Sequence, residues 1–387
     1  MFGISLSKFV FMFQKVLLSI SYHFFRTLKS NRGPIDWVIG VDEIAANVSY
    51  LSESIDNSFS VSLSKNKFYD YSYDFKLSHS EKPRLMLIKR ALSGPIVLGY
   101  LLSKAKGFYY LFSTGFLLDN VDHREYEFSY IKSKNKKIVC GFVGADIRST
   151  KLTLDFAQKN NIEMYASYHF MANTEQISNE NTKRARARVS ESYADIIFNC
   201  SIDQMGYFKN KTTPFMYYYP DYLFYKNENK FCNIEIVKIV HAPSSPIYKG
   251  TQLIRAAISR LVDEGYKFDY VEIVGKPNKD VLNALREAHI VLNEFYALAP
   301  GLFGVEAMSS YCTLVTSADE NIEPDLPSGS NNAWFVTKPY QIYEHLKLLL
   351  DNLPLMKNYA DSGYEWALEN AAISSTGKKL QSMLNKL

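Results

Sequence analysis

The feature that most constrains the fold is an alternation of short apolar strands and amphipathic helices between residues 234 and 317. Residues 234–240 (IEIVKIV), 270–275 (YVEIVG) and 289–295 (HIVLNEF) are predicted strands. Between the first two, apolar residues recur at helical spacing: Leu253, Ile254, Ala257, Ile258, Leu261 and Val262. This alternation predicts a parallel sheet, whose ligands bind where carboxyl ends of strands meet amino ends of helices.

The loop after the first of these strands holds residue types suited to an anion. The sequence HAPSSP is followed by Lys249, Gly250 and Thr251 at the start of a predicted helix. A glycine there lets the backbone approach a phosphate, and the helix N-terminus offers unpaired N–H groups. We therefore predict that the Lys249 ammonium binds a diphosphate and offsets the charge that grows on a leaving group. The alternative is a surface lysine at a helix start.

A second loop, residues 300–304 (PGLFG), precedes Glu306, which we expect at the start of another helix. Backbone N–H groups of this loop are predicted to form a second anion site facing Lys249. The alternative for Glu306 is a carboxylate that merely stabilises a helix N-terminus.

The segments HAPSSPIYKGT, AHIVLNEF and GLFGVEAMSSYCTLV, in this order, resemble the C-terminal half of family 4 glycosyltransferases (glycosyltransferase group 1). The resemblance implies an α/β chain of the GT-B fold, with two Rossmann-like doubly wound parallel-sheet domains facing a central cleft, and a retaining transfer. It implies that Glu306 accepts hydrogen bonds from the donor ribose. The donor-binding residues implied are His241, Ser244, Lys249, Gly250, Gly275, Glu294, Gly301, Leu302, Phe303, Gly304 and Glu306.

The sequence departs from the family pattern at three places. Many members have a second glutamate that faces the transferred sugar, and Leu298 stands at that position here. The pair Asn293-Glu294 matches the acidic-or-amide pair of a subgroup. Tyr311 and Thr313 replace the usual glycine and proline before the next strand.

The first half of the chain is predicted to be α/β as well. A buried strand ends in Gly144-Ala145-Asp146-Ile147-Arg148, which resembles the G-S-D-x-R element of a bacterial surface-polysaccharide subgroup. We predict catalytic roles for Asp146 and Arg148 beside Lys249 and Glu306: Asp146 holds acceptor hydroxyls or orients Arg148, and Arg148 binds a phosphate through two hydrogen bonds. The alternative is a buried Asp–Arg pair that fixes the loop.

With 387 residues the chain suits two domains and a leading segment. We predict an amphipathic segment at residues 1–32, an acceptor-side domain at 33–228 and a nucleotide-sugar domain at 229–387. The resemblance implies that a C-terminal helix crosses back to the first domain. Residues 1–32 are too polar for a spanning helix and have no signal cleavage site, so we expect them on an anionic membrane surface. The alternative is packing on the domain or in a dimer.

The amino-acid composition limits the classes of ligand and partner that we expect. The net charge of +4 suits an anionic ligand or an acidic membrane face, and falls short of a nucleic-acid footprint. The four cysteines form no CxxC pair, which argues against zinc and disulfides and favours a reducing cytoplasm. The seven histidines have no metal-ligand spacing, and DxD is absent, so we expect neither metal nor cofactor. Besides His241, His169 is a candidate for the cleft.

These observations together predict a hexosyltransferase-like enzyme at the inner face of the cytoplasmic membrane. Its donor would be a UDP- or GDP-sugar and its acceptor a glycan, most sensibly a lipid-linked lipopolysaccharide or capsule precursor. Two alternatives stay open: a non-catalytic GT-B scaffold, favoured by Leu298, and a GT-B nucleotide-sugar epimerase, which would need acidic catalytic pairs. A dehydrogenase is disfavoured because no GxGxxG follows a strand. Aromatic clusters at 68–75 and 215–225 are expected in the core unless they face the cleft.

Overall fold

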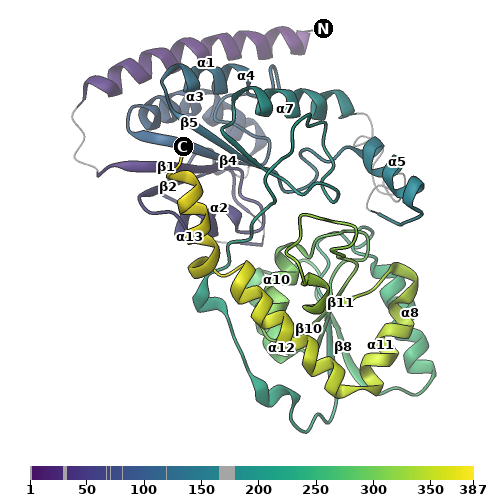
Figure 1. The fold of residues 1–387 in the computed structure, drawn as a ribbon. Helices are drawn as coiled ribbons and strands as arrows, with labels where there is room; N and C mark the ends of the chain where they lie inside the picture. Colours follow the sequence, from purple (N-terminus) through teal and green to yellow (C-terminus); the bar gives the residue numbers. More distant parts are fainter. Residues whose placement is uncertain are drawn as a thin grey trace.

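A computed structural model describes residues 2–28, 33–66, 68–69, 71–80, 82–118, 120–164 and 179–387. The chain forms two parallel sheets with helices packed on their faces, one sheet in each half (Figure 1). The predicted α/β class and two Rossmann-like units are confirmed. His169 lies outside the described residues.

The first sheet has the strand order β3-β2-β1-β4-β5-β6, and every pairing is parallel. Val38 of β1 lies opposite Phe59 of β2 and Phe108 of β4, and all three are buried in the core. The strands are β1 (Ile35–Val41), β2 (Ser58–Ser62), β3 (Phe75–Lys76), β4 (Ala105–Leu111), β5 (Lys137–Gly141) and β6 (Ile196–Phe198). The helices of this half are α1 (Phe2–Thr27), α2 (Asn47–Glu53), α3 (Pro83–Leu102), α4 (Glu125–Ser133), α5 (Thr150–Asn160) and α7 (Glu180–Tyr193).

The second sheet has the order β11-β10-β9-β7-β8, again with parallel pairings. Its strands are β7 (Val237–His241), β8 (Phe268–Glu272), β9 (Ile290–Leu292), β10 (Thr313–Thr316) and β11 (Phe335–Val336). The α-helices are α8 (Thr251–Asp263), α9 (Asn278–Glu287), α10 (Gly301–Ser309), α11 (Ile342–Asp351), α12 (Leu353–Asn370) and α13 (Ile373–Leu384). Short 3-10 helices are η3 (Asp221–Leu223), η4 (Glu228–Phe231), η5 (Ser330–Asn332) and η6 (Pro339–Gln341).

One helix boundary differs from the prediction in a way that matters for the site. Residues 301–304 were expected in a loop, but α10 begins at Gly301 and the Gly304 N–H already donates to the Pro300 carbonyl (3.2 Å). Glu306 therefore lies in the second turn of α10 and not at its start. The anion-binding N–H groups are those of a helix's first turn, which have no partner four residues back.

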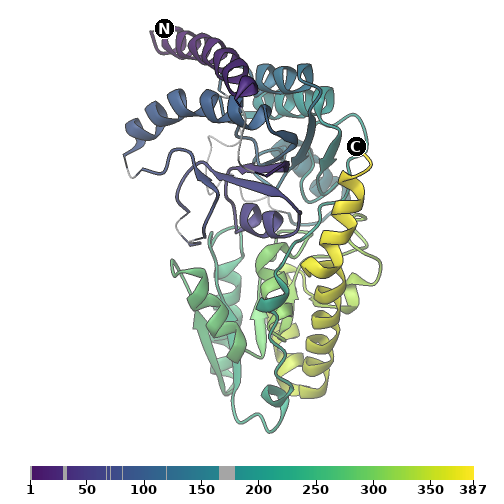
Figure 2. The same ribbon diagram turned by 90° about the vertical axis from the view of Figure 1, so that its left-hand side faces the viewer.

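The last helix returns to the first half of the molecule (Figure 2). Helix α13 contacts α2, and the Tyr219 N–H donates to the Ala371 carbonyl (2.7 Å) just before α13. Leu380 and Leu384 are buried in the same apolar cluster as Trp37 of β1. The C-terminus thus contributes to the core of a domain that begins more than 330 residues earlier.

Helix α1 lies along the outside of the first domain (Figure 1). Phe11, Leu18 and Tyr22 pack inward from it. In the described part of the chain, one helical segment, Arg84–Leu102 of α3, is long and apolar enough to cross a membrane by length and composition alone, which is weak evidence for a span.

Candidate functional site

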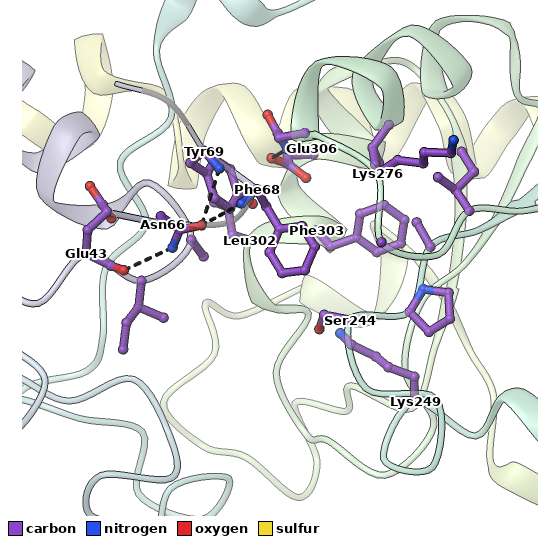
Figure 3. A pocket seen from close by; sticks show the side chains of 18 residues that line it. Glu43, Asn66, Phe68, Tyr69, Ser244, Lys249, Lys276, Leu302, Phe303 and Glu306 are labelled. Carbon is purple, nitrogen blue, oxygen red and sulfur yellow. Dashed lines mark hydrogen bonds between the residues drawn. The ribbon is translucent and has the colours of Figure 1, made fainter. Parts of the chain in front are cut away.

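The carboxyl ends of the strands of both sheets border a cavity of about 400 Å³ between the two domains. Loops after β1, β2, β7 and β8, the first turn of α9 and the first turns of α10 supply its walls. The lining residues that carry polar groups are Glu43, Asn66, Tyr69, Ser244, Lys249, Lys276, Asn278 and Glu306. In Figure 3, Lys249 and Ser244 lie together on one side of this cavity and Glu306 on another. The predicted donor residues Ser244, Lys249, Gly275, Leu302, Phe303 and Glu306 all border it.

Lys249 reaches the cavity from the turn that starts α8. Gly250, next in the chain, has φ of 75°, the left-handed conformation that glycine adopts without steric cost. The Lys249 ammonium forms an ion pair with the Glu294 carboxylate (Nζ to Oε2, 2.7 Å), which follows β9. Both predicted donor residues thus meet in one charged pair. Lys249 also lines a second cavity, so it stands where the two cavities join.

Glu306 is buried, and its Oε1 accepts a hydrogen bond from the Asn278 side-chain amide (2.8 Å). Burial raises the pKa of this carboxyl from 4.5 to about 7, against the opposing effects of Asn278 and of the Lys249 charge. Among the described residues, the Asn278 amide is the one side chain that donates a hydrogen bond to this buried carboxyl. A ligand hydroxyl would supply another donor.

Some residues in the first turn of α10 line the cavity, and others pack beneath it. Gly301 has φ of 61°, and its N–H donates to the Tyr217 hydroxyl (3.2 Å). Leu302 and Phe303 border the cavity. Gly304 lies below it, because a Cβ there would come within 2.7 Å of the Pro300 Cβ. The structure therefore assigns Gly304 to close packing under the turn rather than to the donor.

His241 does not line either cavity, contrary to the prediction that it touches the donor. Its ring is buried at the end of β7, with Nδ1 2.8 Å from the Leu292 carbonyl and Nε2 2.8 Å from the Thr251 hydroxyl. A carbonyl only accepts, so Nδ1 carries the proton and Nε2 accepts from Thr251. Burial lowers the His241 pKa to about 4, so the ring is neutral. His241 holds the first residue of α8 in place behind Lys249.

The second cavity, of about 420 Å³, adjoins the first and extends toward the first domain. Arg148, Tyr217, Tyr248 and Glu294 are among its lining residues. The Arg148 guanidinium pairs with Asp203 (Nη2 to Oδ2, 2.7 Å) and donates from Nε to the Asp203 carbonyl (2.5 Å). The other Asp203 oxygen accepts from the backbone N–H of Leu298 (2.7 Å). Asp203 therefore ties Arg148 to the second domain.

Asp146 stands apart from this pair, contrary to the prediction that it orients Arg148. Its carboxylate is buried and accepts from the backbone N–H groups of Gly144 (3.0 Å) and Ile147 (3.1 Å). Burial raises the Asp146 pKa to about 6. The carboxyl stabilises its own turn and lines neither cavity, so an acceptor cannot reach it in this conformation.

The residue at the position of the missing family glutamate is packed rather than exposed. Leu298 is buried with Ala157 and Met164 of the first domain. Its backbone N–H is held by Asp203. This position thus joins the domains and offers no carboxylate to a sugar.

Several lining residues escaped the sequence-based prediction. Asn278 begins α9 after β8, and the same edge-of-sheet rule that singled out Lys249 would have found it. Phe68 and Tyr69 line the cavity. These two residues of the aromatic cluster 68–75 therefore face the cleft, which was the exception to the expected place in the core. The Asn278 N–H donates to the Phe68 carbonyl (3.0 Å), so this wall joins the two domains. Glu43 gave no sequence signal.

Among the described residues, no group of three or more His, Cys, Asp or Glu side chains gathers as a metal site would.

No protein-family model matches the chain, and no curated protein matches it. Solved structures do. A sucrose-phosphate synthase from Thermosynechococcus elongatus aligns with a TM-score of 0.60 and 11% identity over 92% of this chain and 99% of its own. Anabaena HepE, solved in complex with UDP-glucose, aligns at 0.56 with 11% identity over 91% and 100%. WaaG, a glycosyltransferase involved in lipopolysaccharide biosynthesis, aligns at 0.53 with 14% identity over 90% and 99%.

The chain has the GT-B fold. Two parallel sheets with helices on their faces, in a chain that aligns with these structures over 90 to 92% of its length, confirm the predicted fold. At identities of 11 to 14% the likeness concerns architecture alone.

Proposed function

We propose that the chain is a glycosyltransferase that moves a sugar from a nucleotide-diphosphate sugar to a glycan acceptor. One observation carries the proposal: Lys249, the first turn of α10 and the buried Glu306 border a single cavity at the carboxyl edge of the second sheet. A cation, free helix N–H groups and a buried carboxyl are what the diphosphate and ribose of such a donor require.

The donor would lie with its diphosphate between Lys249 and the N–H groups of Leu302 and Phe303. Its ribose hydroxyls would donate to Glu306. The diphosphate at Lys249 and the ribose at Glu306 would together set the direction of the nucleotide in the cavity. Phe68, Tyr69 and Phe303 offer aromatic faces to the base. HepE was solved with UDP-glucose, which supports a UDP-sugar here, with a GDP-sugar as the other donor to test.

In the transfer step the bond between the anomeric carbon and the diphosphate breaks, and the acceptor oxygen forms the new bond. Negative charge grows on the departing diphosphate, where the Lys249 ammonium stabilises it. Neither cavity is lined by a histidine. We propose retention, with the leaving phosphate taking the acceptor proton and no metal taking part. The acceptor would enter through the second cavity, past Arg148 and Tyr217.

We further propose that the acceptor is a lipid-linked precursor of a bacterial surface polysaccharide and that the protein works at the inner face of the cytoplasmic membrane. The likeness of fold to WaaG agrees with this assignment.

A second candidate is a GT-B scaffold that binds a nucleotide sugar without transferring the sugar. The buried Leu298 and the Lys249–Glu294 pair favour it, because they leave no free carboxylate at the sugar end of the cavity among the lining residues. Thermal-shift measurements with a panel of nucleotide sugars, followed by assays of nucleotide release, separate the two. Binding with release in the presence of acceptor lipid supports the transferase. Binding without release supports the scaffold, and no binding refutes both.

A further inference from the structure

Helix α1 presents two apolar faces. One packs on the first domain through Phe11, Leu18 and Tyr22. The opposite face points to solvent and carries Phe9, Met12, Phe13, Val16, Ile20 and Phe24, all exposed. A surface helix of a soluble domain normally turns charged residues to that side. This outward face is therefore built for an apolar environment.

Helix α3 continues the same surface. Its exposed apolar residues are Leu85, Leu87, Ile88, Leu92 and Ile96. The two helices run side by side, since the Gln14 amide donates to the Ala91 carbonyl (3.2 Å) and the Lys104 ammonium to the Leu28 carbonyl (3.1 Å). At Gly99 an added Cβ would come within 2.7 Å of the Ser21 Cβ, so only glycine permits this approach. We call the exposed apolar residues of both helices the α1–α3 surface.

The charged residues on the two helices themselves have one sign. Helices α1 and α3 contain six lysines and arginines and no aspartate or glutamate, in a chain whose net charge is only +4. Lys8, Arg26, Arg84 and Lys89 are exposed. An apolar face bordered by cations matches an anionic lipid surface, with side chains among the acyl chains and cations at the headgroups. Two copies of the chain would instead bring like charges together.

Neither helix is placed to span the bilayer. Leu98, Leu101 and Leu102 at the end of α3 are buried in the core of the first domain, and a span would remove them from it. Helix α3 can therefore lie along a membrane surface with its exposed half, but it cannot cross the bilayer without leaving the core.

We propose that the α1–α3 surface docks this protein on an anionic membrane, with both helices in the plane of the interface. Helix α3 is an equal part of the contact, so residues 1–32 alone do not account for it. The inference stands without the glycosyltransferase assignment, since it uses no residue of either cavity.

The test uses the full chain without nucleotide. Flotation with vesicles of phosphatidylcholine, alone or mixed with phosphatidylglycerol, measures the partition coefficient. We expect strong binding to the anionic vesicles, weakened by salt as the charges are screened. The double variant Leu87→Ser/Ile88→Ser, at side chains 58% and 57% exposed, should lower the partition coefficient at least about tenfold. The matched control Val262→Ser/Leu348→Ser, at side chains 57% and 45% exposed on the second domain, should leave it unchanged.

Arg84→Glu/Lys89→Glu should remove the preference for anionic over neutral vesicles. Thermal melting shows whether each variant is folded. If the folded Leu87→Ser/Ile88→Ser variant binds vesicles as strongly as the parent, α3 has no role in the contact. If the parent protein binds neither kind of vesicle, the proposal is wrong. A parent dimer that this variant converts to a monomer, with no vesicle binding by either, would show that a second copy covers the surface.

Discussion

Replacing Glu306 by glutamine tests the donor site most directly. The amide has the size of the carboxyl, and its oxygen still accepts the 2.8 Å hydrogen bond from Asn278. The fold should therefore persist. The substitution removes an ionisable carboxyl group whose pKa burial raises to about 7.

The stability effect has a definite sign. The folded-state pKa of Glu306 lies above its ordinary value of 4.5, so the carboxyl's contribution is fully present below about pH 4.5 and is lost as the pH rises through about 7. Over that window the parent loses up to about 3 kcal/mol that the glutamine variant keeps. The free energy of unfolding of Glu306→Gln, relative to the parent, should therefore rise from acidic to neutral pH. Urea denaturation at a series of pH values measures this difference.

The binding effect has the opposite direction. If ribose hydroxyls donate to an ionised Glu306, the variant should lose about 1.5–3 kcal/mol of nucleotide-sugar affinity, roughly tenfold to a hundredfold. The parent should bind more tightly as the pH rises through 7, and the variant should not. A 2′-deoxyribose donor should bind parent and variant with similar affinity. Isothermal titration with a nucleotide sugar is suitable, because a diphosphate esterified at both ends does not titrate in this range.

Glu127→Gln is the matched control. Glu127 is also a buried carboxyl with a raised pKa, but it borders neither cavity and accepts from the N–H groups of Phe116 and Leu117. Because the amide nitrogen of glutamine would face one of these N–H donors, Glu127→Gln should lose stability, and it should keep nucleotide affinity. If Glu306→Gln instead melts earlier at every pH and binds the nucleotide like the parent, Glu306 is a structural residue of α10 and the donor site is wrongly placed.

Lys249→Ala should lower the thermal stabilisation by UDP or GDP by about 1.5–3 kcal/mol. Adding Glu294→Gln should restore part of that stabilisation, because it removes the carboxylate left without its lysine. If Lys249→Ala shows the same thermal shift as the parent, the phosphates bind elsewhere. The lowered His241 pKa gives stability that is present above pH 6.5 and lost as the pH falls through about 4, so in urea denaturation His241→Gln should flatten that acid-side slope. Leu380→Ala should cost about 2–5 kcal/mol in chemical unfolding, and a cost near zero would mean that α13 does not pack on the first domain.

The sequence was sufficient for the architecture because each β-α unit encodes itself locally. Apolar runs of strand length, amphipathic helices and short turns repeat before and after His241, and parallel sheets follow from that alternation. The same logic placed Lys249 and Glu306 at the edge of the second sheet. The predicted strands were displaced or too long by a few residues. The start of α10 was misjudged, because residues 301–304 have the composition of a loop and the hydrogen bonding of a helix.

Tertiary structure alone decided which charges meet. Arg148 pairs with Asp203, 55 residues away in the chain, rather than with Asp146 of the same turn. His241 is enclosed by Leu292 and Thr251, so it supports the start of α8 behind Lys249. The pKa of Glu306 and the outward apolar face of α3 also depend on what covers each side chain. Periodicity specifies an element and the face it buries, but ion pairing and desolvation depend on distances between elements, which are fixed only when the two domains and the returning α13 pack together.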